Sequence, residues 1–447
     1  LGGCACGIWF PGKREGRCRG LDSSSENTRQ RSVLEIVAKG TNMTDVKRRN
    51  RASILRLIYS TGGMSRKDIA RQLKLTPAAI TVLTNEMINE GLLEETGEEH
   101  SPGRAGRREI IVDICCRKYH AVGININLDH TVVTCLDLKG GTLFEDRFRT
   151  DNSSTPEQFA RYVWEVIEDN LRAIKKDNIV GLGVGVRGIV DSRRGISLES
   201  YGLWDEQVNV KEIFTELTRL PVGVDNNVRN IARGQLFFAQ DKPRSFLLVK
   251  YGPGIGGALM VQEGLFTGHN YRAIELGHVV VEEQGALCRC NKRGCLETIS
   301  SYYAIEAAVR AVYSLERTPV LYEATGGETD NIDLEAIMQA YRGGDEPVVE
   351  IVSKAMRLFA LVLKNVITLL DPEKVFLYGV AFEHEDFLQL VYDFMQDCTR
   401  AADVKNLVVK SELNGQLSSK GPASLAIQNF FDSGGVVVYP SSLRFGE

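Results

Sequence analysis

A cluster of four possible metal ligands constrains this chain more than any other feature. His278 is followed by Cys288, Cys290 and Cys295, so one imidazole and three thiols fall within eighteen residues. Three thiolates and one imidazole complete the tetrahedral shell of a structural Zn²⁺, and a full shell leaves no open position for a catalytic water. The spacing therefore predicts a zinc ion that organises its surroundings and does not hydrolyse a substrate.

Closely spaced cysteines could instead be buried thiols or the remains of a disulfide. The chain has ten cysteines in 447 residues. We expect no secretory signal, and the cysteines are not spread as a framework of disulfide pairs over a short chain. This usage is typical of a reducing compartment, where clustered Cys and His bind metal. Glu275 and Glu297 flank the cluster and are not needed as ligands, so we expect them to accept hydrogen bonds from a hydroxylated ligand.

The stretch GPGIGGALMVQEGLFTGHNYRAIELGHVVVEEQGALCRCNKRGCLETISS, residues 252–301, resembles the signature of the ROK family. That family joins repressors, open reading frames and sugar kinases, and the resemblance extends more weakly over residues 119–432. It implies that the four residues above bind zinc and that Glu275, His278 and Glu297 face a sugar. Asn291 stands where the family usually has glycine, and asparagine tolerates the left-handed conformation better than most residues.

Length and charge suggest how the chain is divided. A chain of 447 residues is too long for one core. Residues 1–113 carry a formal charge of +5 and the remainder −9, which matches a DNA-facing head on an acidic body. Residues 1–42 are expected to be a disordered or non-native extension, and residues 433–447 a C-terminal tail. No apolar run approaches eighteen residues, so we expect a cytoplasmic protein without a membrane span.

Residues 43–113 have the pattern of an α+β winged helix-turn-helix domain. Apolar residues recur at helical spacing between Val46 and Ser60. Ser65 begins a second helix with an acid three residues later, and Thr76 caps a third helix with Pro77 in its first turn. The segment 43–63 also resembles the start of ROK repressors, including those that respond to xylose and other sugars.

The third helix presents small and polar side chains outward, as a helix that enters the major groove does. The glycine-rich segment after it carries arginines that can contact phosphates or a narrow minor groove, and it predicts the wing. A small protein-docking bundle is the alternative interpretation. The predicted DNA-binding residues are Ser65, Arg66, Thr76, Pro77, Ala78, Thr81, Val82, Asn85, Arg104, Arg107 and Arg108.

Beyond Tyr119, strand-like and helical segments alternate, which predicts a layered α/β body. The resemblance implies the two-lobed fold shared by actin and hexokinase, with a ligand between the lobes. The fold class is therefore a winged helix-turn-helix followed by an actin-like or hexokinase-like ROK body. The sugar-binding residues that the resemblance implies are Gly188, Asn226, Asn227, Glu275, His278 and Glu297.

The phosphoryl-transfer residues of ROK kinases are replaced. A kinase of this fold has DxGxT after its first strand, where this chain has residues 125–130, NINLDH. The general base is an aspartate in NDxN, and Asn227 aligns best with it, although a shifted register would bring Asp225 there. Arg187 replaces a proline before Gly188. An amide does not accept a proton near neutral pH, so the chain is expected to bind a sugar without phosphorylating it.

These observations together predict a sugar-responsive transcriptional regulator, most simply a repressor of carbohydrate-utilisation genes. Its expected partners are double-stranded operator DNA and a sugar or sugar-phosphate effector, with structural Zn²⁺ and a homodimer or a dimer of dimers. The alternative is an ATP-dependent sugar kinase with a regulatory head. A DNA-binding module that no longer responds to sugar is a third possibility.

Overall fold

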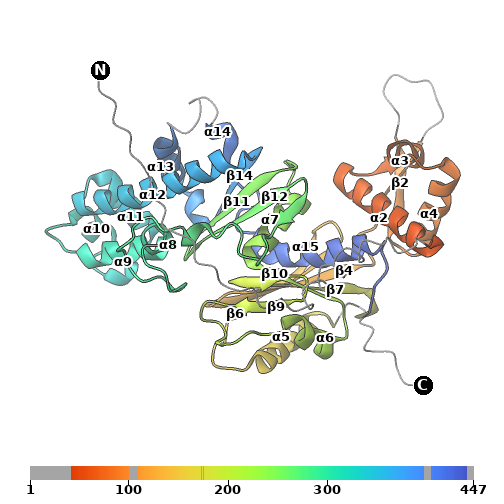
Figure 1. The fold of residues 1–447 in the computed structure, drawn as a ribbon, viewed down its shortest axis with the longest axis horizontal. Coiled ribbons are helices and arrows are strands. Elements are labelled where there is room, and N and C mark those ends of the chain that lie inside the picture. The colour runs from red at the N-terminus through yellow and green to blue at the C-terminus, as the bar shows by residue number, and fades with distance from the viewer. Residues whose placement is uncertain (1–41, 100–108, 173, 175, 397–403, 440–447) are drawn as a thin grey trace, which may run out of the picture. The chain divides into compact units, whose positions relative to one another are not determined.

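The computed structural model describes residues 42–99, 109–172, 174, 176–396 and 404–439 (Figure 1). The predicted N-terminal extension lies outside these residues except for its last position. Residues 48–447 form one compact unit. Within the described ranges, no helix has both the length and the apolar character that crossing a membrane requires.

The head has the predicted helix-turn-helix with a small sheet in the order β1-β3-β2. Ser65 caps α3 by accepting a hydrogen bond from the Asp68 amide, and Thr76 caps α4 through the Ala79 amide. Lys74 ends α3 in a left-handed conformation, which makes the turn tight. Both predicted caps are confirmed. The elements are α2 (Met43–Thr61), β1 (Met64–Ser65), α3 (Arg66–Leu73), α4 (Pro77–Asn89), β2 (Leu93–Glu99) and β3 (Glu109–Ile114).

The first lobe of the body is a five-stranded sheet in the order β10-β7-β4-β5-β6. Strands β10, β7 and β4 are parallel, so Asn226, Val186 and Ile126 lie level with one another at the carboxyl edge. Helices α5 (Pro156–Asn170) and α6 (Val210–Thr218) cover one face (Figure 1). The strands are β4 (His120–Ile126), β5 (His130–Asp137), β6 (Thr142–Arg149), β7 (Ile179–Val186) and β10 (Val222–Asn226), and the short hairpin β8 (Ile189–Asp191) and β9 (Ile196–Glu199) follows β7.

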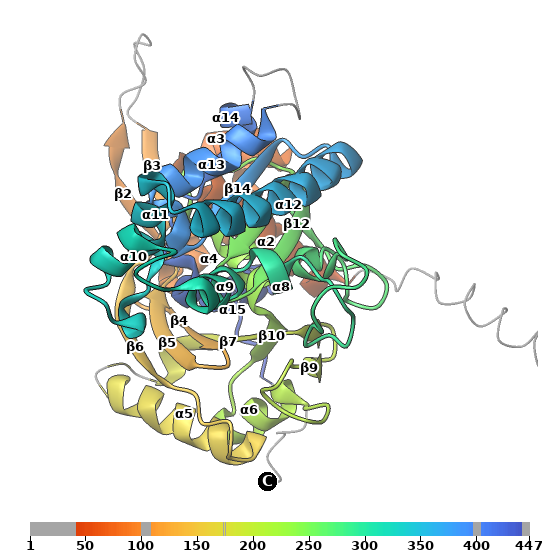
Figure 2. The ribbon, with the colours of Figure 1, turned by 90° about the vertical axis from the view of Figure 1, so that its left-hand side faces the viewer.

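The second lobe is another five-stranded sheet, in the order β13-β12-β11-β14-β15. A group of helices packs on one of its faces (Figure 2), and α7 (Asn227–Phe238) packs on the other. The strands are β11 (Phe246–Tyr251), β12 (Ile255–Val261), β13 (Gly264–Phe266), β14 (Lys374–Tyr378) and β15 (Val408–Lys410). The helices are α8 (Glu297–Ser300), α9 (Tyr302–Val312), α10 (Pro319–Ala324), α11 (Leu334–Gly343), α12 (Glu346–Leu370), α13 (Glu385–Met395) and α14 (Val404–Leu407).

The last helix, α15 (Leu417–Asp432), lies on the other face of the first sheet and also packs on α7 (Figure 1). Glycines allow this close approach. A Cβ added to Gly183 of β7 would lie 1.7 Å from the Pro422 carbonyl oxygen, and one added to Gly123 of β4 would lie 2.7 Å from the Ala423 nitrogen. The backbones of helix and sheet are therefore in direct contact.

The head docks on the C-terminal end of α15. Ile54, Leu55 and Ile58 of α2 share one buried cluster with Phe430 and Phe431. The Tyr59 ring lies 5.4 Å from the Phe431 ring, measured between centroids. Apolar burial of this kind stabilises a fixed contact between domains.

Polar contacts extend this docking beyond α15. The buried guanidinium of Arg51 donates a hydrogen bond of 2.8 Å to the Gly434 carbonyl and pairs with Glu90 inside the head. Arg56 pairs with Asp432 at the end of α15. Val437 also packs against the shared cluster. The first part of the predicted C-terminal tail thus contributes to the contact between head and body.

Replacing Gly183 with alanine should destabilise the body, because the added Cβ would overlap the Pro422 carbonyl. Overpacking between two main chains should lower the free energy of unfolding by about 3 kcal/mol. Gly252→Ala is the matched control, since a Cβ there would meet no heavy atom within 4 Å. Urea unfolding of both variants measures the difference, and equal midpoints would contradict the contact.

Candidate metal centre, ligand pocket and recognition helix

Four side chains from the second lobe converge on one point. His278 ends the short 3₁₀ helix η2 (Leu276–His278), and the three cysteines lie in the loop that leads to α8. One donor atom from each of His278, Cys288, Cys290 and Cys295 lies within 4.8 Å of every other. The predicted ligand set is therefore assembled by the fold.

The spacing of the donors fits zinc. In a tetrahedral site, two sulfur ligands lie about 3.8 Å apart, and a sulfur and a nitrogen about 3.6 Å. Cys290 Sγ and Cys295 Sγ are 3.6 Å apart, and Cys288 Sγ lies 3.5 Å from His278 Nδ1. Burial raises the pKa of the Cys288 thiol, so a bound cation would have to displace its proton. Nδ1 is the histidine nitrogen that faces the cluster.

The loop that carries the cysteines is shaped by two positions with positive φ. Asn291 has φ 64° and donates its amide to the Cys288 carbonyl at 2.9 Å. This conformation explains why asparagine can stand where the family has glycine. Gly294 has φ 65°, and a Cβ there would lie 1.5 Å from the Glu282 carbonyl oxygen. The loop can therefore close only with glycine at that position.

Glu275 and Glu297 lie beside His278. A carboxylate oxygen of Glu275 is 3.8 Å from His278 Nε2, and Glu297 Oε1 is 3.6 Å from Nδ1. Burial raises the pKa of Glu275 to about 7. Cys288 Sγ lies 3.2 Å from Glu297 Oε1, so Glu297 has its other oxygen available to a ligand.

On the first lobe, the predicted sugar-binding amides are occupied by protein groups. Asn226 donates from Nδ2 to the Gly188 carbonyl at 2.6 Å, while its Oδ1 caps α7 by accepting from the Val228 amide. Asn227 Nδ2 donates to Asn127 Oδ1 at 3.1 Å. Gly188 has φ 88°, and a Cβ there would lie 2.0 Å from the Glu199 carbonyl oxygen. Asn226 thus shapes the turn that brings Gly188 close.

Asp225 is held in a buried ionic network that the sequence reasoning missed. Its Oδ1 lies 2.6 Å from Arg229 Nε, and its Oδ2 lies 3.1 Å from Arg233 Nη2. Arg229 also donates to the Val190 carbonyl, and Arg233 donates to Gln428 of α15 at 2.7 Å. The spacing of four residues between Arg229 and Arg233 was part of the available signal, because it places both on one face of α7. Asp225 lies in β10, directly before the residue that caps this helix.

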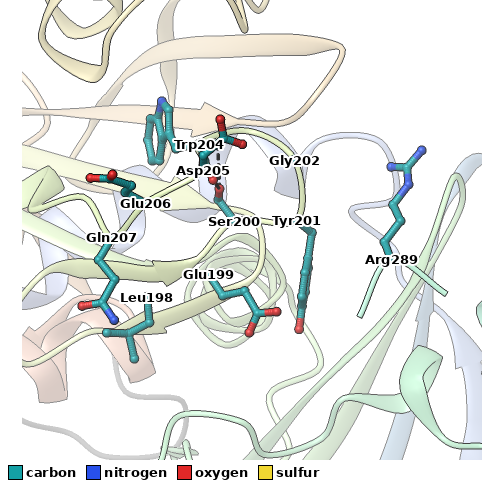
Figure 3. A pocket seen from close by; sticks show the side chains of 10 residues that line it. All are labelled: Leu198, Glu199, Ser200, Tyr201, Gly202, Trp204, Asp205, Glu206, Gln207 and Arg289. Atoms are coloured by element: carbon teal, nitrogen blue, oxygen red, sulfur yellow. Dashed lines mark hydrogen bonds between the residues drawn. The ribbon is translucent and has the colours of Figure 1, made fainter. Parts of the chain in front are cut away.

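A pocket of about 470 Å³ adjoins the metal centre (Figure 3). The Tyr201 ring lies 5.2 Å from the His278 ring, measured between centroids. The Arg272 guanidinium, in the second lobe, pairs with the Glu199 carboxylate of the first lobe at 2.8 Å. In the view of Figure 3, Tyr201 stands between Glu199 and Arg289. The pocket is lined by Leu198, Glu199, Ser200, Tyr201, Gly202, Trp204, Asp205, Glu206, Gln207 and Arg289. None of these was a predicted site residue. Most of them lie in the loop after β9, and the path of a loop leaves no periodic pattern in the sequence.

The outer face of α4 is open. Val82 is 58% exposed, and the other predicted contacts on this face are also exposed: Pro77, Ala78, Thr81 and Asn85. Thr76 is exposed as well and caps the helix. Ser65 and Arg66 have structural contacts instead, since Ser65 is buried and Arg66 bonds to Thr84, Asn85 and Glu95. The predicted wing residues Arg104, Arg107 and Arg108 lie outside the described residues.

Comparison with known proteins agrees with this architecture. The ROK family model matches residues 121–429. The chain belongs to the ROK family. The MarR family model matches residues 48–97, within the head.

Several relatives of this ROK protein are similar along most of their length. It is 27% identical over 392 residues to the DNA-binding transcriptional dual regulator NagC of Escherichia coli strain K12, covering 83% of this chain and 91% of that protein. It is 25% identical over 375 residues to a xylose repressor of Caldicellulosiruptor bescii, covering 83% of this chain and 92% of the repressor.

Solved structures confirm the predicted fold class. A ROK family transcriptional regulator, described as a homologue of the E. coli MLC protein, superposes with a TM-score of 0.70 at 23% identity, covering 87% of this chain and 98% of that one. A ROK family glucokinase from Streptomyces griseus, solved with glucose and AMPPNP, has a TM-score of 0.58 at 25% identity and covers 69% of this chain and 99% of its own. The ROK fold therefore occurs in both regulators and kinases.

In this ROK protein the turn after β4 has contacts of its own. The Asp129 carboxylate lies 2.9 Å from His130 Nδ1, and Asn127 faces Asn227. Asp225, the other candidate for the base, has both oxygens bonded to guanidinium groups. A general base must reach the proton that it removes. Asp225 is thus engaged through both oxygens, whereas Asp129 is exposed and lies beside a single imidazole.

Zinc content should depend on the cysteines of the cluster and not on cysteines elsewhere in the chain. Purified protein is expected to hold about one zinc per chain, and Cys290→Ser or Cys295→Ser should lose it, because three ligands no longer fill the shell. Cys116→Ser is the control, since that thiol lies outside the cluster. Elemental analysis after dialysis measures the number of zinc ions per chain. Full zinc retention by both cluster variants would contradict the site.

Proposed function

We propose that this chain is a sugar-responsive transcriptional repressor. The head binds operator DNA through α4, and the body binds a sugar beside a structural zinc held by His278 and the three cysteines. The observation that carries the proposal is the docking of a winged helix on α15, a helix that also contacts the edge of the ligand site through Gln428 and Arg233. The regulatory names of NagC and the xylose repressor support it.

The sugar would lie between the two lobes. Glu275 and Glu297 would accept hydrogen bonds from its hydroxyl groups, and the imidazole nitrogen of His278 that faces Glu275 would contact it directly. Gly188 would allow close approach from the first lobe, with Asn226 holding that turn and Asn227 facing the ligand from the start of α7. A hydrogen bond from a hydroxyl to a charged carboxylate contributes more to the free energy of binding than a hydrogen bond between neutral groups, about 1.5–3 kcal/mol each.

Binding could reach the head through contacts already described. Arg229 and Arg233 hold Asp225 at the carboxyl edge of the first sheet, and Arg233 bonds to Gln428. Two positions further along α15, Phe430 contacts the cluster shared with α2. A sugar that binds one arrangement of the lobes better than another would shift the position of α15 and of paired heads on their half-sites. We propose that the protein acts as a homodimer or a dimer of dimers.

The rival proposal is a sugar kinase with a regulatory head. The glucokinase from Streptomyces griseus gives it a structural precedent. Phosphoryl transfer depends on positioning and on neutralising charge, and a general base contributes about 10²–10⁴-fold. Here an amide stands at the best-aligned base position and Asp225 is bound by two arginines. These replacements favour binding without reaction.

DNA binding should depend on the exposed face of α4. Thr81→Glu places a carboxylate where DNA phosphates and base-edge acceptors would approach, so operator affinity should fall by at least about 10-fold. Thr368→Glu adds the same charge to an exposed position of α12 and should leave affinity unchanged. Fluorescence anisotropy on DNA selected by the full chain from a random library measures both. Equal affinities for the two variants would exclude α4 as the recognition helix.

No sugar should be phosphorylated. Zinc-loaded protein with Mg²⁺ and ATP is expected to release ADP at the background rate with every sugar of a broad panel. An amide stands at the best-aligned base position, Asp225 is bound by two arginines, and residues 125–130 do not have the acid, glycine and threonine of the kinase loop in their places. The glucokinase from Streptomyces griseus, assayed in parallel, sets the sensitivity of the coupled assay. Sugar-dependent ADP release by this chain would replace the repressor proposal with the kinase proposal.

A further inference from the structure

One guanidinium in the head joins three of its elements. Arg66, the first residue of α3, donates from Nε to Thr84 Oγ1 at 3.1 Å and from Nη2 to Asn85 Oδ1 at 3.0 Å, and both partners lie on α4. Nη2 also lies 2.8 Å from Glu95 Oε1 in β2, the strand that leads to the predicted wing. The Arg66 side chain is only 19% exposed. These contacts hold the guanidinium in one place.

Thr84 gives this guanidinium a rigid anchor. The Thr84 side chain is fully buried, and its hydroxyl donates to the Ile80 carbonyl at 2.8 Å, one turn earlier in α4. Because the hydroxyl hydrogen is used in that bond, the Thr84 oxygen is left to accept from Arg66. Glu95 balances the charge of Arg66. The guanidinium is therefore oriented and paired before any DNA approaches.

The bond from Arg66 determines which way the Asn85 amide is turned. A guanidinium has donors and no acceptor, so the atom of Asn85 that faces it must be the oxygen. The NH₂ group of the same amide is then directed away from Arg66. Within the described part of the chain, Nδ2 of Asn85 makes no hydrogen bond, and the residue is exposed. Asn85 thus offers an oriented donor at the surface of α4.

This donor lies on the face of α4 that is expected to enter the major groove. Thr81 and Val82 precede Asn85 by four and three residues, so the three share one face. The Thr81 hydroxyl donates to the Pro77 carbonyl at 2.8 Å, and Val82, Pro77 and Ala78 have no polar side-chain atom. Base pairs differ in the donors and acceptors that they present in the major groove. Of these five exposed side chains, Asn85 is therefore the one equipped to distinguish them by hydrogen bonding.

We propose that Asn85 reads one base pair in each operator half-site, and that Arg66 is the positioning residue that fixes the Asn85 amide for this contact. The inference rests on the proposed DNA-binding function and names the residues that set its sequence preference. Arg66 acts through Asn85 and does not itself contact DNA.

The arrangement favours one base pair for two physical reasons. Fixing the amide in advance reduces the side-chain entropy that is lost when DNA binds. Turning the amide over, so that it exchanges its donor and acceptor, would place the NH₂ group against the guanidinium, where two donors face each other. A base pair that requires the opposite orientation is therefore disfavoured, which is how a recognition residue gains specificity.

The experiment measures affinity for a set of related DNA duplexes. The full chain first selects its operator from a random DNA library, and each base pair of that operator is then replaced in turn. Fluorescence anisotropy gives the affinity of each protein variant for every duplex. Asn85→Ala should lose discrimination at one base pair of each half-site and keep it at the others. Arg66→Met should reduce discrimination at that same base pair by about 5-fold or more.

The double variant tests whether the two residues act as a unit. Arg66→Met should cause no further loss of discrimination once Asn85→Ala is present, because residues that act through one contact are not additive. Each ratio compares two duplexes on the same preparation, so it does not depend on the fraction of the protein that is folded.

Lys67→Met is the matched control. It removes the positive charge next to Arg66 along α3, where the exposed Lys67 pairs with Glu109 at 3.2 Å, and it should leave discrimination unchanged at every base pair. Arg66→Lys keeps the charge without the planar fork of donors, so it should not restore full discrimination. Full discrimination by Arg66→Lys would assign the effect to charge alone and overturn the positioning role.

The remaining outcomes separate this inference from the proposed function. If Arg66→Met weakens binding to every duplex by the same factor, Arg66 is a structural residue of the head. If Arg66→Met lowers the slope of log affinity against log salt by about one, Arg66 contacts a phosphate. Either result overturns the positioning role, and unchanged discrimination in Asn85→Ala overturns base reading by Asn85, while the proposed function stands. A full chain that enriches no sequence from the library would overturn the proposed function as well.

Discussion

The contact between α15 and the first sheet is the constraint on which the rest of the molecule depends. Gly183 and Gly123 bring the helix backbone onto β7 and β4 without side chains between them. The helix therefore has little freedom to move relative to the sheet. Its other side packs on α7, and its end carries the aromatic residues that hold the head. One helix thus fixes three parts of the chain at once.

The ionic network around Asp225 gives the carboxyl edge of the first sheet a structural role. A buried carboxylate is tolerated when its charges and hydrogen bonds are satisfied, and here two arginines do this. Arg233 carries the network onward to Gln428. Polar residues at the carboxyl edge of the first sheet thereby become part of the contact with α15.

Short-range features were predictable from sequence and long-range contacts were not. The ligand spacing of the cysteine loop and the caps at Ser65 and Thr76 depend on a few adjacent residues, and the structure has both. The contact of α15 with the first sheet depends on glycines in strands that are far away in the sequence. In the sequence alone, a glycine in a strand indicates only a position that weakens the strand. The engagement of Asp225 and the place of Tyr201 over His278 likewise depend on packing between elements.

The order of elements along the chain has a consequence for synthesis. The head emerges from the ribosome before the body, and the helix on which it docks follows the other described elements of the body along the chain. Until α15 is complete, the apolar face of β4 and β7 and the docking surface of α2 remain uncovered together. A chain that stops before residue 417 would thus carry a complete helix-turn-helix beside an unfinished body. Such a product would be prone to aggregate, which couples the appearance of a usable DNA-binding head to the completion of its sensor.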